Sequence, residues 1–261
     1  MTSFSLTDKT AWVTGGGSGI GKAICCTLAE AGAVVHILEI DEDLGNETCH
    51  AIREKLGPKH AHCWQVDVAN QKQVMDVSEN ILQNGTVDIL VNNAGIALVG
   101  ALEQTSEDDL DKLFRVNVQG GYNCMYACIS TMKKNGGGII VNLASTVASI
   151  AIKDRFAYSM TKGAMLTMTY SVAMDYIDAG IRCNAISPGR IHTPFVDGFV
   201  AKNYPGREKE MFEKLSSDQP IGRMGTPQEI ADLVLFLCSD EAAFITGSNY
   251  NIDGGFANLI K

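Results

Sequence analysis

The sequence predicts an α/β fold in which a doubly wound parallel sheet of about seven strands is flanked by helices. Short apolar runs alternate with longer stretches of helical periodicity along the whole chain. Right-handed crossovers between such strands place helices on both faces of the sheet. The 261 residues contain no repeat, low-complexity tract or linker, so we expect a single domain that spans 1–261.

Each expected element follows from its local pattern. The apolar runs that predict buried strands are 10–14, 34–38, 62–66, 88–92, 138–143, 181–186 and 249–252. The stretches with helical periodicity are 19–31, 43–56, 70–83, 106–134, 157–178 and 227–238. Segment 190–220 interrupts the alternation of strands and helices, because it is long, contains Pro194, Pro205 and Pro220, and mixes aromatic with charged residues. A long excursion after a strand end is typical of a lid over a substrate site.

Composition narrows the class of protein. A hydrophobic content of 46% with 20% charged residues is typical of a globular chain, and no apolar run approaches the length of a membrane span. The net charge of −9 argues against a nucleic-acid partner. The N-terminal stretch has no apolar signal core, so we expect a cytoplasmic protein with free thiols at its eight cysteines.

A metal site is not expected. His60, His62 and Cys63 lie together in KHAHCW (59–64), but no second ligand cluster follows at zinc-like spacing.

The stretch TGGGSGIG (14–21) predicts a phosphate-binding turn. It lies between the first strand and the first helix and has the pattern GxxxGxG, from Gly15, Gly19 and Gly21, in place of GxGxxG. Glycines allow a tight turn and a close backbone approach, and the N-terminus of the following helix favours a pyrophosphate. A turn of this kind is typical of a Rossmann dinucleotide-binding fold.

Glu39 favours NAD over NADP. It ends the second strand twenty residues after Gly19, where an acidic residue accepts hydrogen bonds from the ribose hydroxyls of the adenosine half. A carboxylate there repels a 2′-phosphate, and the neighbouring positions Ser18 and Ile40 supply no arginine to bind one.

At this point the chain resembles the short-chain dehydrogenase/reductase family over nearly its full length. The motifs that carry the resemblance are TGGGSGIG (14–21), DV (67–68), NNAG (92–95), Asn117 in RVNVQG, Ser145 in VNLAST, YSMTK (158–162) and NAISPGRIHTP (184–194). The family's spacing of thirteen residues between serine and tyrosine is kept. The resemblance implies an NAD-dependent oxidoreductase that interconverts a secondary alcohol and a ketone.

The resemblance also implies roles for individual residues. Asn117, Ser145, Tyr158 and Lys162 would form the catalytic set, with Asn117 in a proton relay through water. Asp67 and Val68 would hold the adenine, Asn93 would support the nicotinamide side, and Ile191 and Thr193 would clasp the carboxamide. The full expected cofactor site comprises Gly15, Gly17, Ser18, Gly19, Ile20, Gly21, Glu39, Asp67, Val68, Asn93, Ala94, Gly95, Tyr158, Lys162, Pro188, Gly189, Ile191 and Thr193.

Tyr158 and Lys162 have a chemical reason to lie four residues apart, on one face of a helix. Alcohol oxidation needs a base, yet a free tyrosine has a pKa near ~10. A lysine ammonium about 4 Å away, at an effective dielectric constant near 20, supplies about the 4 kcal/mol needed to bring that pKa near neutrality. The sequence therefore predicts Tyr158 as acid and base, with Ser145 stabilising the substrate oxygen.

Two arginines bear on the class of substrate. Arg155 lies one helical turn before Tyr158, and Arg190 follows the cofactor-clasping turn; an arginine there is suited to a carboxylate. Arg155 also resembles family members that oxidise hydroxy acids, such as 3-hydroxybutyrate or 3-deoxy sugar acids. We therefore expect a small hydroxy acid or sugar acid that contacts Ser145, Arg155, Tyr158 and Arg190.

Several alternatives remain. A neutral sugar is one, and a hydrophobic or steroid alcohol, bound by aromatic residues of 190–220 (Phe195, Phe199, Tyr204, Phe212), is another. A 3-oxoacyl-carrier reductase generally uses NADPH, which Glu39 disfavours. A non-catalytic NAD-sensing regulator would have lost part of the catalytic set, all of which is present.

The resemblance further implies a homotetramer or dimer, with helices 106–134 and 157–178 meeting their mates. Cys124, Met125 and Cys128 fit either that interface or the core. Residues 253–261 resemble the family's C-terminal turn, which is expected to cross to another subunit.

Overall fold

The computed structural model describes residues 4–83 and 85–259, apart from the side chains of Phe195, Phe199, Lys202 and Asn203. Its strands are β1 (Thr10–Thr14), β2 (Val34–Glu39), β3 (Ala61–Gln65), β4 (Ile89–Asn92), β5 (Gly138–Leu143), β6 (Ile181–Pro188) and β7 (Asn249–Ile252). Its α-helices are α1 (Gly19–Glu30), α2 (Glu42–Leu56), α3 (Gln71–Leu82), α4 (Glu107–Phe114), α5 (Gly120–Lys134), α6 (Phe156–Asp175), α7 (Pro194–Asn203), α8 (Glu208–Ser217) and α9 (Pro227–Cys238).

The seven strands form one parallel sheet in the order β3-β2-β1-β4-β5-β6-β7. This confirms the doubly wound Rossmann fold. The strand order reverses between β1 and β4, where Ala11 pairs with Val35 on one side and Ile89 on the other. Ligands of such sheets bind outside the carboxyl ends of the strands at this reversal.

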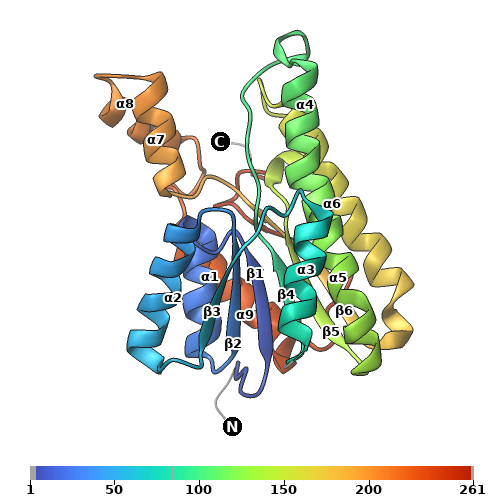
Figure 1. Cartoon of the computed structure of the whole chain (residues 1–261). Helices are drawn as coiled ribbons and strands as arrows, with labels where there is room; N and C mark the ends of the chain where they lie inside the picture. The colour runs from blue at the N-terminus through green and yellow to red at the C-terminus, as the bar shows by residue number, and fades with distance from the viewer. Residues whose placement is uncertain (1–3, 84, 260–261) are drawn as a thin grey trace.

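Helices cover both faces of the sheet (Figure 1). On one face α1 and α9 pack together through fully buried side chains such as Ile24, Leu28, Ile230 and Val234. On the other face α3 and α5 bury Val74, Ile81, Cys128 and Met132 against the strands. The two apolar layers hold the carboxyl ends of all seven strands at one edge of the sheet.

The helix expected over 106–134 is interrupted. Between α4 and α5 the chain forms a π-helical turn at Arg115–Gln119, and turns of this kind often occur at functional sites. The buried Asn117 in this turn bonds to Ile96 and Thr161, which lie outside the helix. Helical periodicity does not report such long-range bonds, so the sequence did not predict the interruption.

Segment 190–220 contains two helices that periodicity did not identify. Pro194 occupies the first turn of α7, where its missing N–H is not needed. The two helices pack on each other through Val200, Met211 and Leu215. Together with Met224, these side chains form a small apolar cluster that is distinct from the main core. They stand apart from the helices that flank the sheet (Figure 1).

All eight cysteines are free thiols, and Cys124, Met125 and Cys128 belong to the core. None of the helices in the described ranges is long and apolar enough to cross a membrane.

Candidate active site

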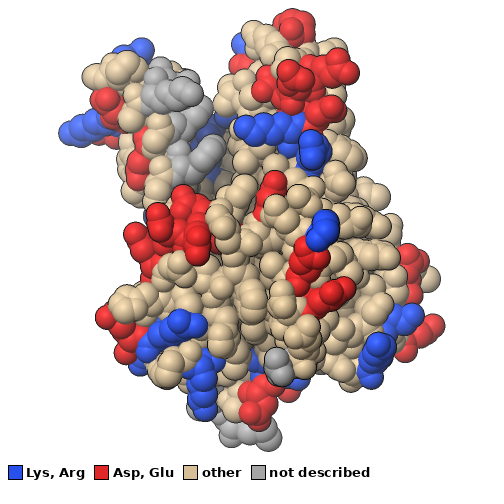
Figure 2. Space-filling view, in the orientation of Figure 1, with Lys and Arg blue, Asp and Glu red and all other residues tan. Residues whose placement is uncertain are grey.

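A cavity of about 690 Å³ lies at the carboxyl ends of the central strands. It opens in the hollow between α4 and the α7–α8 lobe (Figure 2). The expected site residues that line it are Gly15, Ser18, Gly19, Ile20, Gly21, Glu39, Asp67, Val68, Asn93, Ala94, Gly95, Ser145, Arg155, Tyr158, Lys162, Pro188, Gly189, Arg190, Ile191 and Thr193. Gly17 and Asn117 lie behind its wall. One cavity thus gathers residues that are up to 178 positions apart, from Gly15 to Thr193.

The glycine turn has the conformation that its sequence predicts. Gly15 has a φ of +65°, and a Cβ on Gly21 would overlap the carbonyl oxygen of Gly15. Ser18 caps α1 without a side-chain bond to the helix, and its residue lines the cavity. The first N–H groups of α1 therefore face the cavity with room for an anionic group.

Glu39 is held at the far end of this turn. Its carboxylate accepts hydrogen bonds from the N–H groups of Gly17 and Ile40, each at 2.9 Å, and the residue is only 9% exposed. A Cβ on Gly17 would lie 2.9 Å from the same carboxylate oxygen, so only glycine fits. These bonds fix a negative charge at the cavity wall.

Asn93 anchors the glycine turn. Its side-chain amide donates to the carbonyl oxygens of Thr14 and Gly15, both at 3.0 Å. Thr14 in turn accepts from the N–H groups of Asn93 and Ala94. The side-chain amide of Asn93 is thus engaged with the turn, and its contact with a nicotinamide stays a prediction.

Asp67 and Val68, the residues expected to hold the adenine, both line the cavity. The Asp67 carboxylate accepts from the N–H of Ala69 at 2.9 Å. The carbonyl oxygen of Val68 accepts from the buried amide of Asn123 at 2.8 Å, which fixes this loop on α5.

Tyr158 and Lys162 lie one turn apart on α6 and face the cavity. The Lys162 amine donates to the carbonyl oxygen of Leu143 at 2.7 Å and lies 5.8 Å from the centre of the Tyr158 ring. Ser145, just after β5, is 9% exposed, and its hydroxyl accepts from the N–H of Val147 at 3.4 Å.

Asn117 makes three hydrogen bonds. Its side-chain oxygen accepts from the N–H of Ile96 at 2.8 Å, and its amide donates to Ile96 and to the hydroxyl of Thr161 at 3.0 Å. A Cβ on Gly95 would lie 3.2 Å from the Asn117 oxygen and 3.5 Å from the Lys162 amine. Gly95 therefore separates the two side chains and leaves space between them.

The pKa of Tyr158 beside Lys162 differs from the expectation. Burial raises the pKa of Tyr158, while the hydrogen bond with Ser145 and the charge of Arg155 act to lower it. Burial also lowers the pKa of Lys162 to about 8. The expected fall of the tyrosine pKa toward neutrality is therefore absent in the protein alone, because removing the phenolate from water outweighs the nearby charges.

The two arginines differ in their surroundings. Arg155 is the N-cap residue before α6, and its guanidinium donates to the carbonyl oxygen of Asp154 at 2.8 Å. No carboxylate of the described residues lies within 4 Å of it. Arg190 pairs with Asp218 at 3.5 Å, and burial is the main cause that lowers its pKa.

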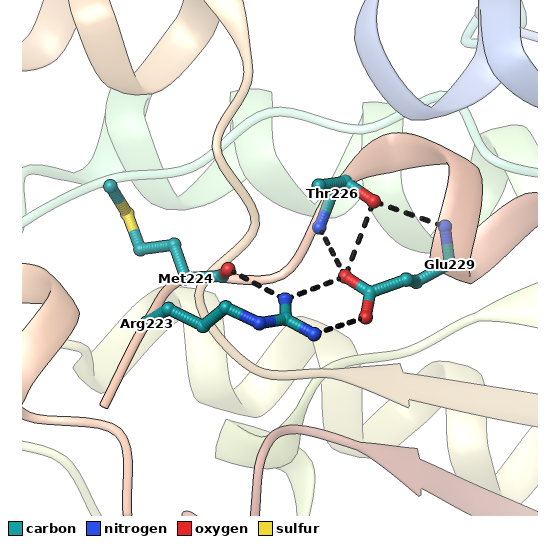
Figure 3. Close-up of polar contacts among 4 residues, drawn as sticks. All are labelled: Arg223, Met224, Thr226 and Glu229. Atoms are coloured by element: carbon teal, nitrogen blue, oxygen red, sulfur yellow. Dashed lines mark hydrogen bonds and ion pairs between the residues drawn. The ribbon is translucent and has the colours of Figure 1, made fainter. Parts of the chain in front are cut away.

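The turn that follows segment 190–220 is held by a network of polar contacts (Figure 3). Arg223 donates to both carboxylate oxygens of Glu229, at 2.9 and 2.6 Å, and to the carbonyl oxygen of Met224. Glu229 also completes a capping box with Thr226 at the start of α9. The bonds from Arg223 and Thr226 lower the pKa of Glu229 to about 2. Met224, which belongs to this network, lines the cavity.

The aromatic wall proposed for a hydrophobic alcohol is not found among the described side chains. Tyr204 packs with the α7–α8 cluster, and Phe212 contacts His192 edge-on, with ring centres 4.9 Å apart. Neither lines the cavity. The side chains of Phe195 and Phe199 lie outside the described part of the chain.

Several cavity residues were missed by the sequence interpretation. Lys112, Val196, Leu215, Met224 and Phe256 line the cavity, although they come from five separate parts of the chain. No local pattern marks them. Thr14 and Thr161, whose side chains bond to site residues, lie within the motifs TGGGSGIG and YSMTK, but the sequence interpretation assigned their hydroxyls no role.

The fold and this site define a dinucleotide-binding oxidoreductase, and comparisons with known proteins agree. A family profile described as enoyl-(acyl carrier protein) reductase matches residues 15–257. The chain is 43% identical to an uncharacterized oxidoreductase of Thermotoga maritima over 95% of this chain and 96% of that one. It is 37% identical to an NAD-dependent glycerol dehydrogenase of Listeria innocua, over 97% and 95% of the two chains.

A solved structure extends the likeness to three dimensions. L-Sorbose reductase from Gluconobacter frateurii, complexed with NADPH and L-sorbose, superimposes with a TM-score of 0.94 at 30% identity, covering 99% of this chain and 100% of that chain. The chain belongs to the short-chain dehydrogenase/reductase family. It is therefore an oxidoreductase of alcohols and ketones that uses a nicotinamide cofactor.

Proposed function

We propose that the chain is an NAD-dependent dehydrogenase of a small hydroxy acid or sugar acid. The observation that carries the proposal is Arg155, which lines the cavity beside Tyr158 and has no carboxylate within 4 Å among the described residues. The charge of Arg155 acts on the Tyr158 hydroxyl, lowering its pKa against the larger effect of burial. An unpaired guanidinium next to the reacting group is suited to a substrate carboxylate.

The cavity residues fit a nicotinamide dinucleotide. The tight turn at Gly15 and the open N-terminus of α1 suit the pyrophosphate, with Ser18, Gly19, Ile20 and Gly21 around it. Asp67 and Val68 would hold the adenine end. Ala94, Gly95, Pro188, Gly189, Ile191 and Thr193 would surround the nicotinamide half. When bound, the cofactor accepts the hydride from the carbinol carbon.

Glu39 supports NAD as the cofactor. Its carboxylate is fixed by backbone N–H groups and faces the cavity, so it would bond to ribose hydroxyls and repel a 2′-phosphate. The Listeria innocua relative is named as NAD-dependent, whereas the L-sorbose reductase binds NADPH. Both choices occur among similar proteins, and Glu39 is the residue of this chain that favours the first.

In the proposed mechanism Tyr158 takes the proton of the substrate hydroxyl during oxidation and returns it during reduction. Ser145 donates a hydrogen bond to the same oxygen and stabilises the negative charge that develops there. Lys162, protonated at neutral pH, favours the phenolate through its charge. Asn117 borders the space next to Lys162 and would hold water for proton exchange with solvent.

Arg155→Met tests the substrate class. Kinetics of purified enzyme with NAD⁺ would compare 3-hydroxybutyrate and sugar acids with glycerol and other neutral alcohols. We expect kcat/KM for the acids to fall by at least about tenfold, since a charge-assisted bond contributes about 1.5–3 kcal/mol. Neutral alcohols should lose much less, because they lose only the effect of the Arg155 charge on the pKa of Tyr158. Arg207→Met, which removes an exposed arginine paired with Glu210 outside the cavity, serves as the matched control. An unchanged kcat/KM for the preferred acid would exclude the carboxylate contact.

A neutral polyol or sugar is the second candidate. It is favoured by the names of two relatives, a glycerol dehydrogenase and an L-sorbose reductase. The same panel separates the two, because turnover limited to neutral alcohols would assign Arg155 a structural role.

We further propose a homo-oligomer, a dimer or tetramer, formed through α5 and α6. These helices expose Tyr122, Tyr126, Met160, Tyr170 and Met174, whose apolar surface a second copy would cover. A monomeric mass in solution at micromolar concentration would contradict this assembly.

A further inference from the structure

Acidic and basic side chains line opposite ends of the cavity. Of the acidic side chains that the structure describes, only Glu39 and Asp67 line the cavity, and both belong to its adenosine end. The cationic side chains Lys112, Arg155, Lys162 and Arg190 line the opposite end, with Tyr158. In a protein with a net charge of −9, this local excess of positive charge needs a cause.

Two of these cations, Arg155 and Arg190, line the same cavity, and the charge of one acts on the other. Burial lowers the pKa of Arg190, Asp218 opposes that effect, and the charge of Arg155 lowers it further. Placing two guanidinium groups near one another in a partly buried site is unfavourable unless anions neutralise them. Within the described chain, Asp218 is the carboxylate within 4 Å of Arg190, and Arg155 has none.

Arg190 also has unused hydrogen-bonding capacity. Its Nε is buried without a hydrogen-bond partner among the described residues, although a guanidinium is suited to forked bonds with a planar anion. A buried donor without a partner is unfavourable, and a bound ligand is one way to satisfy it.

Lys112 adds a third positive charge at the mouth. It lies in the last turn of α4, is exposed, and has no carboxylate within 4 Å in the described ranges. Basic side chains gather on this wall of the hollow, below an acidic tip (Figure 2). The acidic residues of the first turn of α4, Glu107, Asp108 and Asp109, do not line the cavity.

The number of cavity cations without an anionic partner indicates the charge of the expected substrate. Lys162 is set aside because it acts on Tyr158, and one of the other three cations is offset by Asp218. Two positive charges then remain without a partner. From this balance we infer that the substrate carries two anionic groups: a carboxylate beside the carbinol, bound by Arg155, and a second carboxylate or a phosphate, bound by Arg190 and Lys112. This inference rests on the proposed hydroxy-acid function and narrows its substrate to dianions.

The test measures binding and does not require the true substrate. Butyrate, succinate and 3-phosphonopropionate would be titrated into the full-length enzyme saturated with NADH, following the fluorescence of the bound cofactor. Butyrate and succinate have the same number of carbons and differ in the second carboxylate, while 3-phosphonopropionate replaces that carboxylate with a phosphonate. Whichever dianion binds more tightly indicates the second group.

We expect the wild-type enzyme to bind a dianion at least about tenfold more tightly than butyrate, since two cations act on the second group. Lys112→Met should weaken dianion binding by about threefold to fivefold and leave butyrate unchanged. Lys134→Met, which removes an exposed lysine of α5 outside the cavity, is the matched control and should change neither. Arg190→Met should reduce the preference for dianions over butyrate further, whereas Arg155→Met should weaken the binding of all three ligands.

The outcomes separate the two proposals. A dianion preference below twofold, or an equal effect of Lys112→Met on butyrate and succinate, would overturn the dianion inference. Butyrate binding that still depended on Arg155 would in that case leave the hydroxy-acid proposal standing. Binding of all three anions that is unaffected by Arg155→Met would refute the hydroxy-acid proposal itself, and the inference with it.

Discussion

Replacing Lys162 with methionine is the most informative perturbation of the proposed mechanism. The Lys162 amine lies 5.8 Å from the centre of the Tyr158 ring. At an effective dielectric constant of about 20, a charge at that distance stabilises a phenolate by about 3 kcal/mol, or about 2 pKa units. Removing the charge should raise the pKa of the base and lower kcat/KM for oxidation at pH 7 by about 100-fold.

The same perturbation has a specific pH dependence. Because the pKa of Lys162 is lowered to about 8, the amine is mostly protonated at pH 7 and loses its charge above pH 8. The advantage of wild type over Lys162→Met should therefore be greatest below pH 8 and shrink as the pH rises to 10. A pH profile of kcat/KM between pH 6 and pH 10 for both enzymes measures this.

Stability and cofactor binding provide the controls. The folded-state pKa of about 8 lies below the unfolded value of 10.5, so the unfolded chain binds more protons between these pH values. The buried ammonium thus lowers the free energy of unfolding by up to about 3 kcal/mol below pH 8, and this loss is recovered as the pH rises to 10.5. Lys162→Met, which removes it, should melt no lower than wild type at pH 7, and titration of both enzymes with NADH separates any loss of cofactor binding from the loss of catalysis. A ratio of the two kcat/KM values that stays constant from pH 6 to pH 10 would refute the electrostatic role of Lys162.

Three further predictions concern the cofactor site and the sheet. Glu39→Gln keeps an acceptor for the N–H of Gly17 and removes the negative charge. It should raise the ratio of kcat/KM with NADP⁺ to kcat/KM with NAD⁺ by about tenfold, or about 1.4 kcal/mol. An unchanged ratio would contradict the proposed repulsion between Glu39 and a 2′-phosphate. Gly21→Ala forces a Cβ into the turn and should lower stability by about 1–3 kcal/mol, measured by urea unfolding, and weaken NADH binding. Burial lowers the pKa of His36 from 6.5 to about 4, so the unfolded chain binds more protons between these values and stability should fall as the pH drops from 6.5 to 4. In His36→Gln, whose side chain keeps an acceptor for the indole N–H of Trp64, melting curves should show a smaller loss over that range, and an identical loss would exclude His36 as its source.

The sequence alone determined the fold and the order of the site motifs. Alternating strand and helix patterns are local, so the seven strands and most helix bounds lie within one or two residues of the expectation. The glycine turn, Glu39 at the end of β2, and Tyr158 with Lys162 one turn apart depend on short spacings in the same way. Each of these features is encoded by neighbours in the chain, which is why it could be read without a structure.

Tertiary structure decided what depends on residues distant in the chain. The π-helical turn at Asn117 follows from bonds to Ile96 and Thr161, and the pairing of Arg190 with Asp218 joins the two ends of segment 190–220. Lys112 reaches the cavity only because α4 folds over it. The direction of the Tyr158 pKa shift was likewise set by packing, because the loss of hydration on burial depends on every element around the phenol and on no spacing along the sequence.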